Sequence, residues 1–185
     1  MADENSFSEA LKKQQYGLLV VGSKSSDGEP NGMTANWASQ VSSDPQIFAV
    51  AIQAGAHTRR NIDETGVFSI SVLGEGTKDL SLKFTRPSTS SDGRLEDEPV
   101  SYQETGTPVL DSAVGWFECR VVGQSEPGDH VVYFGQVIAG GVADGAATDA
   151  GRYRDALRGL IRRAPVSDLA VHALMTGRVG WNGES

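Results

Sequence analysis

The amino-acid sequence predicts a mostly β protein, an antiparallel barrel that is closed or partly closed, with short helices at its periphery. Short runs in which apolar and polar residues alternate recur along the chain, and this period of two is typical of strands with one buried face. Turn residues, including many of the 22 glycines, separate the runs. Only a few short segments carry helix signals, so the helices are expected outside the barrel.

The barrel is predicted to begin with a hairpin. Residues 16–22 are the expected first strand, and the turn-rich segment 25–32 returns the chain into a second strand at 33–38. Segment 41–45, VSSDP, is expected to break the sheet. The apolar run 47–52 that follows is nearly continuous, which predicts a strand buried on both faces.

A short helix is predicted after this strand. Thr58 is expected to cap a helix over 59–65, and Gly66 follows in the position favoured for a left-handed stop. The alternating residues 67–73 then predict another strand.

The second half of the chain repeats these signals. Thr77 is expected to cap a second short helix that ends at Arg86-Pro87. Segment 88–98, STSSDGRLEDE, has no periodicity and predicts a loop. Alternation over 114–122 predicts a barrel strand, and 130–142 is its expected partner across a Pro-Gly turn.

Length and composition favour a single domain over residues 1–185. A chain of this length buries one sizeable core, and 38% hydrophobic with 22% charged residues is ordinary for a globular protein. Two helices are expected at 152–163 and 168–175.

Charge and cysteine content exclude several classes of function. A net charge of −8 argues against nucleic acid, because that binding depends on clustered Lys and Arg; the arginines of 152–163 are expected to form a helix face. Cys119 is the single cysteine, which excludes an internal disulfide, and no metal site is expected. The N-terminus lacks a hydrophobic signal core and no apolar run approaches 18 residues, so we expect no membrane segment and a cytoplasmic location.

The most informative stretch is 31–58, NGMTANWASQVSSDPQIFAVAIQAGAHT. Small residues such as Ala35, Ala38 and Ser39 allow a planar ring to approach the main chain, whose N–H and C=O groups can contact the polar edge of a heterocycle. Trp37 either flanks such a ring or fills the barrel, whereas Trp116 is expected in the core.

Four separated pieces resemble the flavin reductase-like family of FMN-binding split barrels. They are NGMTANWASQVSSDP, AGAHTRRNIDETGVFSISVLGEG, TPVLDSAVGWFECRVV and GDHVVYFGQV, in that order. The resemblance covers residues 16–153 and leaves 154–185 as a helical C-terminal extension of unknown role. It implies a split β-barrel that binds FMN, with FAD or riboflavin as alternatives, and NAD(P)H as co-substrate. It also implies a homodimer and an oxygenase or redox protein as a partner. The expected flavin-binding residues are Met33, Thr34, Ala35, Asn36, Trp37, Ser39, Val41, Ser42, Gln53, Ala54, Gly55, His57, Thr58, Arg59, Phe84 and Arg86.

The phosphate end of this site is also suggested by the residues themselves. The small residues 54–56 leave backbone N–H groups uncovered, and Thr58, at the start of a helix, is followed by Arg59 and Arg60. Uncovered N–H groups, a positive helix end and two cations together suit an anion. The alternative is that Thr58 merely caps the helix and the two arginines are solvated.

His130 is the candidate catalytic residue. The resemblance implies that the Gly-Asp-His at 128–130 brings this side chain to the flavin face where nicotinamide docks. The alternative is a turn in which Asp129 caps backbone groups and His130 is only a strand residue. In either case hydride passes directly between nicotinamide and flavin, so the protein contributes placement. The expected function is an NAD(P)H-dependent flavin reductase; a flavoredoxin-type electron carrier and a non-catalytic flavin-binding module remain alternatives.

Overall fold

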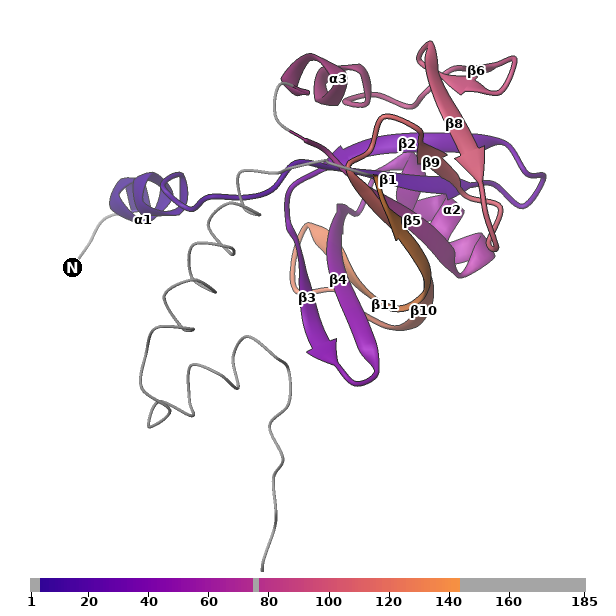
Figure 1. Cartoon of the computed structure of the whole chain (residues 1–185). Coiled ribbons are helices and arrows are strands. Elements are labelled where there is room, and N and C mark those ends of the chain that lie inside the picture. The colour runs from indigo at the N-terminus through magenta and orange to yellow at the C-terminus, as the bar shows by residue number, and fades with distance from the viewer. Residues whose placement is uncertain (1–3, 75–76, 144–185) are drawn as a thin grey trace, which may run out of the picture.

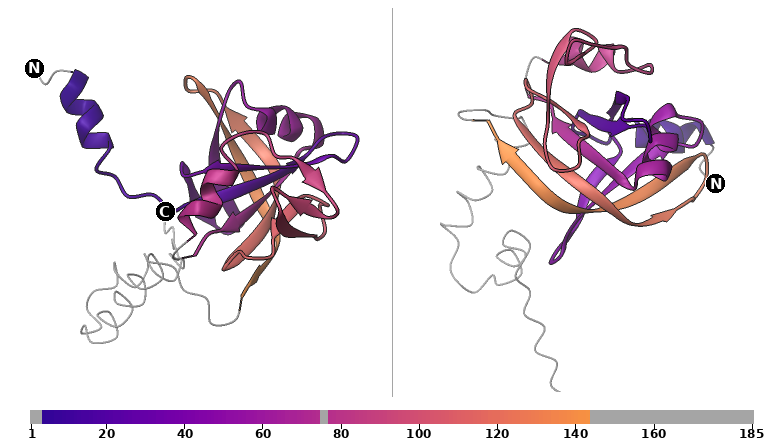
Figure 2. Two further views of the ribbon diagram at one scale, coloured as in Figure 1. Left: turned by 90° about the horizontal axis from the view of Figure 1, so that it is seen from above. Right: turned by 90° about the vertical axis from the view of Figure 1, so that its right-hand side faces the viewer.

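The computed structural model describes residues 4–74 and 77–143, and its centre is a seven-stranded antiparallel sheet that curls into a partly open barrel (Figures 1 and 2). The mostly β, antiparallel barrel expected from the sequence is confirmed. In spatial order the strands are β2 (Pro30–Ala35), β1 (Leu19–Lys24), β5 (Val67–Val72), β10 (Gly115–Ser125), β11 (His130–Val142), β4 (Gln46–Gln53) and β3 (Ala38–Ser43).

The connectivity explains why this sheet curls. Its two edge strands, β2 and β3, follow one another in the chain and are joined only by Asn36 and Trp37. A flat sheet of this size would separate its edges by about 29 Å, at roughly 4.8 Å per strand. Three residue steps reach about 11 Å at most. The sheet must therefore bend until its edges approach each other.

Within the part of the chain that the structure describes, three helices and a small second sheet lie around the barrel. α1 (Glu4–Leu11) stands away from it, whereas α2 (His57–Thr65) packs across β1 (Figure 1). α3 (Lys78–Lys83) lies with the second sheet on one side of the barrel. That sheet contains β6 (Ser90–Ser91), β7 (Arg94–Leu95), β8 (Glu98–Tyr102) and β9 (Pro108–Leu110).

Two apolar clusters hold these layers together. The larger fills the barrel and the smaller joins the barrel to the second sheet. The first contains Leu19, Val21, Ala35, Val50, Ile52, Ile62, Phe68, Ile70, Cys119, Val131 and Tyr133, and the second Val20, Leu73, Phe84, Leu95, Leu110 and Ala113.

Several sequence expectations about the first strands are wrong. The second strand begins at Pro30 and ends at Ala35, and the expected break at 41–45 is instead the end of β3 and its turn into β4. β3 was hidden by its composition, because most of its side chains are polar or exposed at the edge of the sheet. The first strand runs over β1, three residues later than the expected start.

The expected burial of 47–52 on both faces is also wrong. Val50 and Ile52 are fully buried in the barrel core, but Ala49 and Ala51 point to the other face and are only half-buried. Residues of alternating size therefore give this strand a packed face and an open face.

The expected loop at 88–98 folds into short strands. Asp92-Gly93 and Glu96-Asp97 form two consecutive two-residue turns with positive φ, and Leu95 between them is buried. Asp-Gly between short polar strands is a recognised hairpin signal, but its polar surroundings concealed it.

Helix ends were predicted with mixed success. The left-handed stop at Gly66 is confirmed, with φ of 69° and a 2.8 Å bond from its N–H to the Ile62 carbonyl. The expected cap at Thr58 is wrong, since Ala56 occupies that position and no side chain bonds there. Thr77 occupies the cap position of α3 as expected, but its side chain makes no cap bond and donates to the Gly74 carbonyl, and the helix ends at Lys83, before Arg86.

The long hairpin of β10 and β11 confirms the strand pair expected in the second half of the chain. Glu118 and Cys119 are both fully buried although they alternate between the two faces of β10, because the barrel core covers Cys119 and the Thr105 N–H and hydroxyl donate to the Glu118 carboxylate on the other face. The expected helices at 152–163 and 168–175 lie outside the described residues. Within the described residues, no helix is long and apolar enough to cross a membrane.

Candidate functional site

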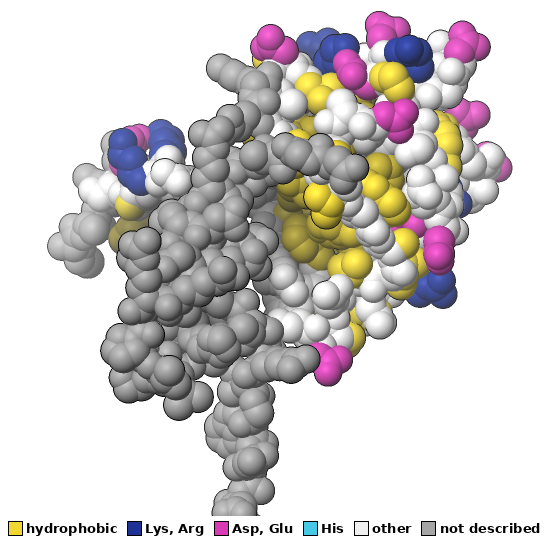
Figure 3. All heavy atoms as spheres, viewed as in Figure 1, with side chains coloured by type: hydrophobic (Ala, Val, Ile, Leu, Met, Phe, Trp, Pro, Cys, Tyr) yellow, Lys and Arg dark blue, Asp and Glu magenta, His cyan; other side chains and the backbone are white. Residues whose placement is uncertain are grey.

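A cleft of about 430 Å³ opens beside the link between β2 and β3. Its walls come from the segment before β1, from the link itself, and from β3, β4 and β11. Figure 3 shows hydrophobic side chains gathered around a hollow on the face seen in Figure 1. The lining residues are Gln14, Gln15, Tyr16, Gly17, Asn36, Trp37, Ala38, Ser39, Ala49, Ala51 and Val132.

Small side chains shape the floor of the cleft. Ala49 and Ala51 are the open-face residues of β4, and Ser39 pairs with Ala49 across the strands. The link is fixed to this floor because the Ala51 N–H donates to the Trp37 carbonyl at 2.9 Å. The volume lies within the range of small-molecule sites, and short side chains let a planar ring approach the backbone. The site therefore fits an aromatic heterocycle.

Trp37, which lines this cleft, is in contact with His130. Their ring centroids are 4.7 Å apart with an interplanar angle of 43°. Trp37 is 47% exposed, so it does not fill the barrel. The structure thus brings together a residue expected to bind flavin and the residue expected to meet nicotinamide.

The His130 ring is oriented by its neighbour. Its Nδ1 lies 2.7 Å from an Asp129 carboxylate oxygen. The hydrogen bond from His130, together with its positive charge when protonated, lowers the pKa of Asp129. The carboxylate remains ionised and fixes Nδ1–H toward itself, so Nε2 is the ring nitrogen left for other partners.

The turn before α2 differs from the expected anion site. Gln53, Ala54 and Gly55 are exposed, and open space lies where Gly55 would carry a Cβ. However, the Ala54 N–H already donates to the Asp129 carbonyl, and the Ala56 N–H donates to Gln53. The expectation of wholly uncovered amides over 54–56 is therefore wrong for two of the three.

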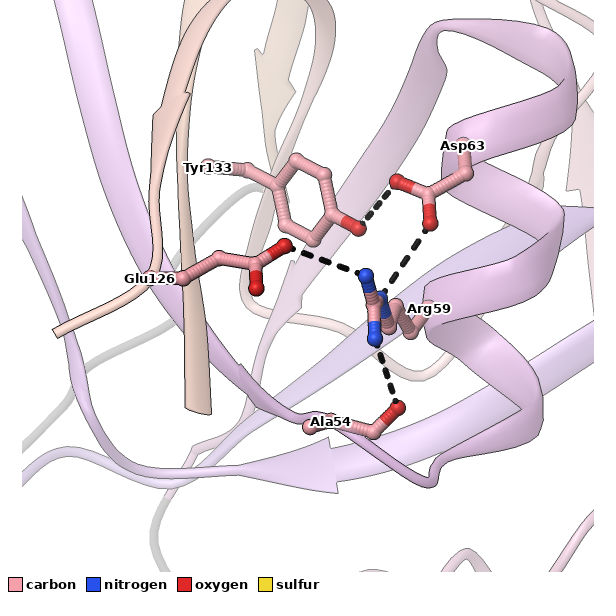
Figure 4. Close-up of polar contacts among 5 residues, drawn as sticks. All are labelled: Ala54, Arg59, Asp63, Glu126 and Tyr133. Atoms are coloured by element: carbon pink, nitrogen blue, oxygen red, sulfur yellow. Dashed lines mark hydrogen bonds and ion pairs between the residues drawn. The ribbon is translucent and has the colours of Figure 1, made fainter. Parts of the chain in front are cut away.

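Arg59 is not a free cation beside this turn, contrary to expectation. Its guanidinium contacts Asp63 at 3.2 Å, Glu126 at 3.1 Å and the Ala54 carbonyl at 3.2 Å (Figure 4). Two carboxylates already neutralise its charge. Arg60 is exposed, and its Nη2 lies 3.1 Å from Nδ1 of His57.

Thr58 points into a buried polar cluster beneath α2. Its hydroxyl accepts a hydrogen bond from the Asn31 amide at 2.9 Å, and Asn31 in turn accepts one from the Ser88 N–H at 3.0 Å. Asn61 and Ser23 complete the cluster, which is almost fully buried. Burial of α2 against β1 explains this orientation, since Thr58 lies on the packed face of the helix.

The remaining expected flavin residues lie outside the cleft lining. Ala35 and Phe84 are buried in the two core clusters, and the Thr34 hydroxyl donates to the Ser81 carbonyl. Met33 packs against the barrel core. Val41, Ser42 and Arg86 are exposed or half-buried.

Sequence reasoning missed several lining residues. Gln14, Gln15 and Tyr16 precede the barrel and carry no motif. Ala49 and Ala51 did carry a signal, because alanine at alternate positions of an apolar strand leaves space on one face. Val132 gave none, since its position in an alternating strand is typical of any barrel.

Comparison with known proteins places this architecture in a family. The model for the flavin reductase like domain matches residues 11–160. The chain belongs to the flavin reductase-like family.

Relatives of this flavin reductase-like protein include enzymes from several bacteria. It is 33% identical over 145 residues to Flavin reductase (NADH) from Kitasatospora aureofaciens, covering 76% of this chain and 73% of that protein. It is 31% identical over 137 residues to a probable flavin reductase of Rhizobium meliloti (strain 1021), of which it spans only 43%. It likewise spans 38% of the reductase component of a trigonelline monooxygenase from Acinetobacter baylyi.

A solved structure shares the fold. The NADH:FAD oxidoreductase SgcE6 of Streptomyces globisporus C-1027, in complex with NAD and FAD fragments, has a TM-score of 0.68 and 25% identity. The similarity covers 78% of this flavin reductase-like chain and 86% of that one.

Proposed function

We propose that this protein is an NAD(P)H-dependent flavin reductase that binds FMN in the cleft beside Trp37. The observation that carries the proposal is the contact of Trp37 with His130 at a cleft floored by alanines. Relatives named as NADH-dependent reductases support it. FAD and riboflavin are alternative ligands. FAD is supported by the structural relative that was solved with NAD and FAD fragments.

The residues of this chain would provide binding and placement. Ala49 and Ala51 leave room for the ring, and Trp37 borders it on one side. His130, held by Asp129, would position the nicotinamide through Nε2. When bound, flavin supplies the two-electron acceptor that amino-acid side chains lack. Exclusion of water and correct placement of the donor are then the contributions of the protein.

Anaerobic spectroscopy tests the proposal. The purified protein is saturated with FMN, and bleaching of the flavin band at about 450 nm is followed on adding NADH and then NADPH. Rapid bleaching is the expected result. A protein that binds FMN but is inert to both nucleotides would indicate a carrier or a binding module, and failure to bind any flavin would contradict the site.

The His130→Ala variant separates donor placement from flavin binding. We expect nearly unchanged FMN affinity with slower reduction by NAD(P)H, since the lost contact belongs to the donor. Reduction by dithionite, which needs no docking site, serves as the control. Wild-type reduction kinetics in this variant would contradict a role in donor placement and would leave His130 as an ordinary strand residue.

We further propose a homodimer that serves an oxygenase or another redox protein. Phe7 and Leu11 lie one helical turn apart on α1 and are 58% and 65% exposed, so together they offer a small apolar surface to a second copy of the chain. The partner is supported by relatives that are named as the reductase component of a monooxygenase and the reductase subunit of a demethylase.

Analytical ultracentrifugation of the wild-type protein and of the Phe7→Ser/Leu11→Ser variant tests the dimer. A variant that remains as dimeric as the wild-type protein would contradict this role for α1.

A further inference from the structure

Arg59 contacts both backbone segments that flank His130. Its Nη1 donates to the Ala54 carbonyl at 3.2 Å, and its Nη2 donates to Glu126 at 3.1 Å. Glu126 belongs to the turn that leads into β11, whose first residue is His130. Ala54 is itself tied to this turn, because its N–H donates to the Asp129 carbonyl at 2.9 Å. One guanidinium thus bridges the end of β4 and the start of β11.

Asp63 fixes the orientation of the Arg59 guanidinium. Its Nε donates to one oxygen of Asp63 at 3.2 Å, and the other oxygen of Asp63 accepts a 2.6 Å hydrogen bond from the Tyr133 hydroxyl (Figure 4). Tyr133 is fully buried in the barrel core. Burial and the nearby Asp63 carboxylate raise the pKa of Tyr133, so its hydroxyl remains a donor at neutral pH. Asp63 is therefore oriented by the buried Tyr133, and it in turn orients Arg59.

The chemistry of the side chain suits this bridging role. A guanidinium presents N–H donors in several directions within one plane, so it can contact two carboxylates and a carbonyl together. A lysine ammonium is a compact charge on a flexible stem and cannot span the same three acceptors with one fixed geometry. Two of these acceptors lie on the segments that place His130.

We infer that Arg59 is a positioning residue for His130, acting by clamping the 53–55 turn to the 126–130 turn. This inference rests on the proposed function for the part that concerns nicotinamide, because His130 is the proposed donor contact. It assigns Arg59 a role distinct from the phosphate contact expected from the sequence. Trp37 lines the proposed flavin cleft, whereas His130 contacts Trp37 without lining the cleft, so loss of the clamp should affect the donor far more than the flavin.

Kinetics provide the first test. We expect Arg59→Ala and Arg59→Lys to raise KM for NADH about fivefold or more, while the Kd for FMN changes less than twofold. Glu126→Gln, on an exposed turn, should give a smaller change in the same direction without disturbing the barrel. Lys83→Ala is the matched control, since it removes an exposed lysine paired with Glu98 at 2.7 Å in the second sheet. Guanidinium ion added to Arg59→Ala should partly restore KM.

Trp37 fluorescence provides a test that needs no activity. The emission of Trp37, isolated by subtracting a Trp37→Phe spectrum, reports its contact with His130. We expect Arg59→Ala to change this emission in the wild-type background and to have no effect in a His130→Ala background. Lys83→Ala should leave it unchanged in both.

The outcomes separate this inference from the proposed function. A fluorescence change that depends on His130, in a protein that does not oxidise NADH, would support the clamp and contradict the reductase. Wild-type emission and KM in Arg59→Ala would overturn the clamp while leaving the reductase intact. Equal losses of NADH and FMN binding in both Arg59 variants and in Glu126→Gln would also overturn it, since they would indicate a general structural role.

Discussion

The cleft and the Arg59 network both lie near His130, through Trp37 and through the turns at Ala54 and Glu126, and they differ in how their groups are used. In the cleft, small side chains such as Ala51 leave space, and Trp37 is half exposed. In the network, each charged group of Arg59, Asp63 and Glu126 has a partner within 3.2 Å. A ligand site requires unfilled volume, whereas side chains that hold a site in place require their hydrogen bonds and ion pairs to be satisfied within the protein. His130 thus has one neighbour, Trp37, in the cleft that can accept a ligand, and its backbone is held by the Arg59 network, whose groups are already paired.

Filling the open region should have the largest effect. Ala51→Phe places an aromatic ring on the cleft floor, so we expect FMN affinity to fall about 100-fold or more, equivalent to about 2.7 kcal/mol. Isothermal titration calorimetry measures the change. Val122→Phe, at an exposed position of β10, is the control and should bind FMN normally. Unchanged affinity in Ala51→Phe would place the flavin outside this cleft.

Opening a gap in the buried polar cluster of Asn31 and Thr58 beneath α2 should reduce stability instead. Asn31 is 3% exposed and bonds both Thr58 and Ser88. Asn31→Ala leaves these groups without their partner, and we expect a loss of about 2 to 3 kcal/mol in the free energy of unfolding. Urea unfolding measures it. Asn36→Ala, on the exposed link, should change stability by less than about 0.5 kcal/mol; similar losses in the two variants would contradict the comparison.

Alkaline pH should reveal the buried core through Cys119. Burial, followed by the nearby Glu118 charge, raises the pKa of this thiol to about 12. The unfolded thiol ionises near 8.5. Below that pH the thiol is protonated in both states and the folded state keeps its full stability. As pH rises from there toward 12, ionisation of the unfolded thiol lowers the free energy of unfolding by about 1.4 kcal/mol per pH unit. Cys119→Ala should remove this slope between pH 9 and 10, and identical slopes for both proteins would show that the thiol is accessible.

The smallest effect is expected at Arg60, in the first turn of α2. If the flavin phosphate lies at the start of α2, the exposed Arg60 remains available to it, because Arg59 is already paired. Arg60→Ala should weaken FMN binding about threefold, since exposed ionic contacts contribute less than about 1 kcal/mol. Riboflavin, which lacks the phosphate, is the control ligand. Equal weakening of both ligands would place the phosphate elsewhere.

The sequence by itself determined the class of fold and the family-like order of motifs. Alternation over 130–142 and the glycine stop at Gly66 depend on local preferences, which operate within a few residues. Trp37 and His130 were both recognised as site residues, because each lies in a motif.

Only the tertiary structure decided which of these residues meet. Trp37 touches His130 because the two edges of the sheet are joined by a two-residue link, which curls the barrel and brings β4 and β11 against that link. Asp63 lies four residues after Arg59 on the same helix, a spacing that the sequence shows, but Glu126 comes from a turn distant in sequence, so no local pattern could show that two carboxylates meet Arg59. Thr58 turned inward for the same reason, since burial against β1 outweighs a cap worth about 1 kcal/mol. Contacts between residues distant in sequence depend on packing of the whole chain, and a periodic pattern carries no information about them.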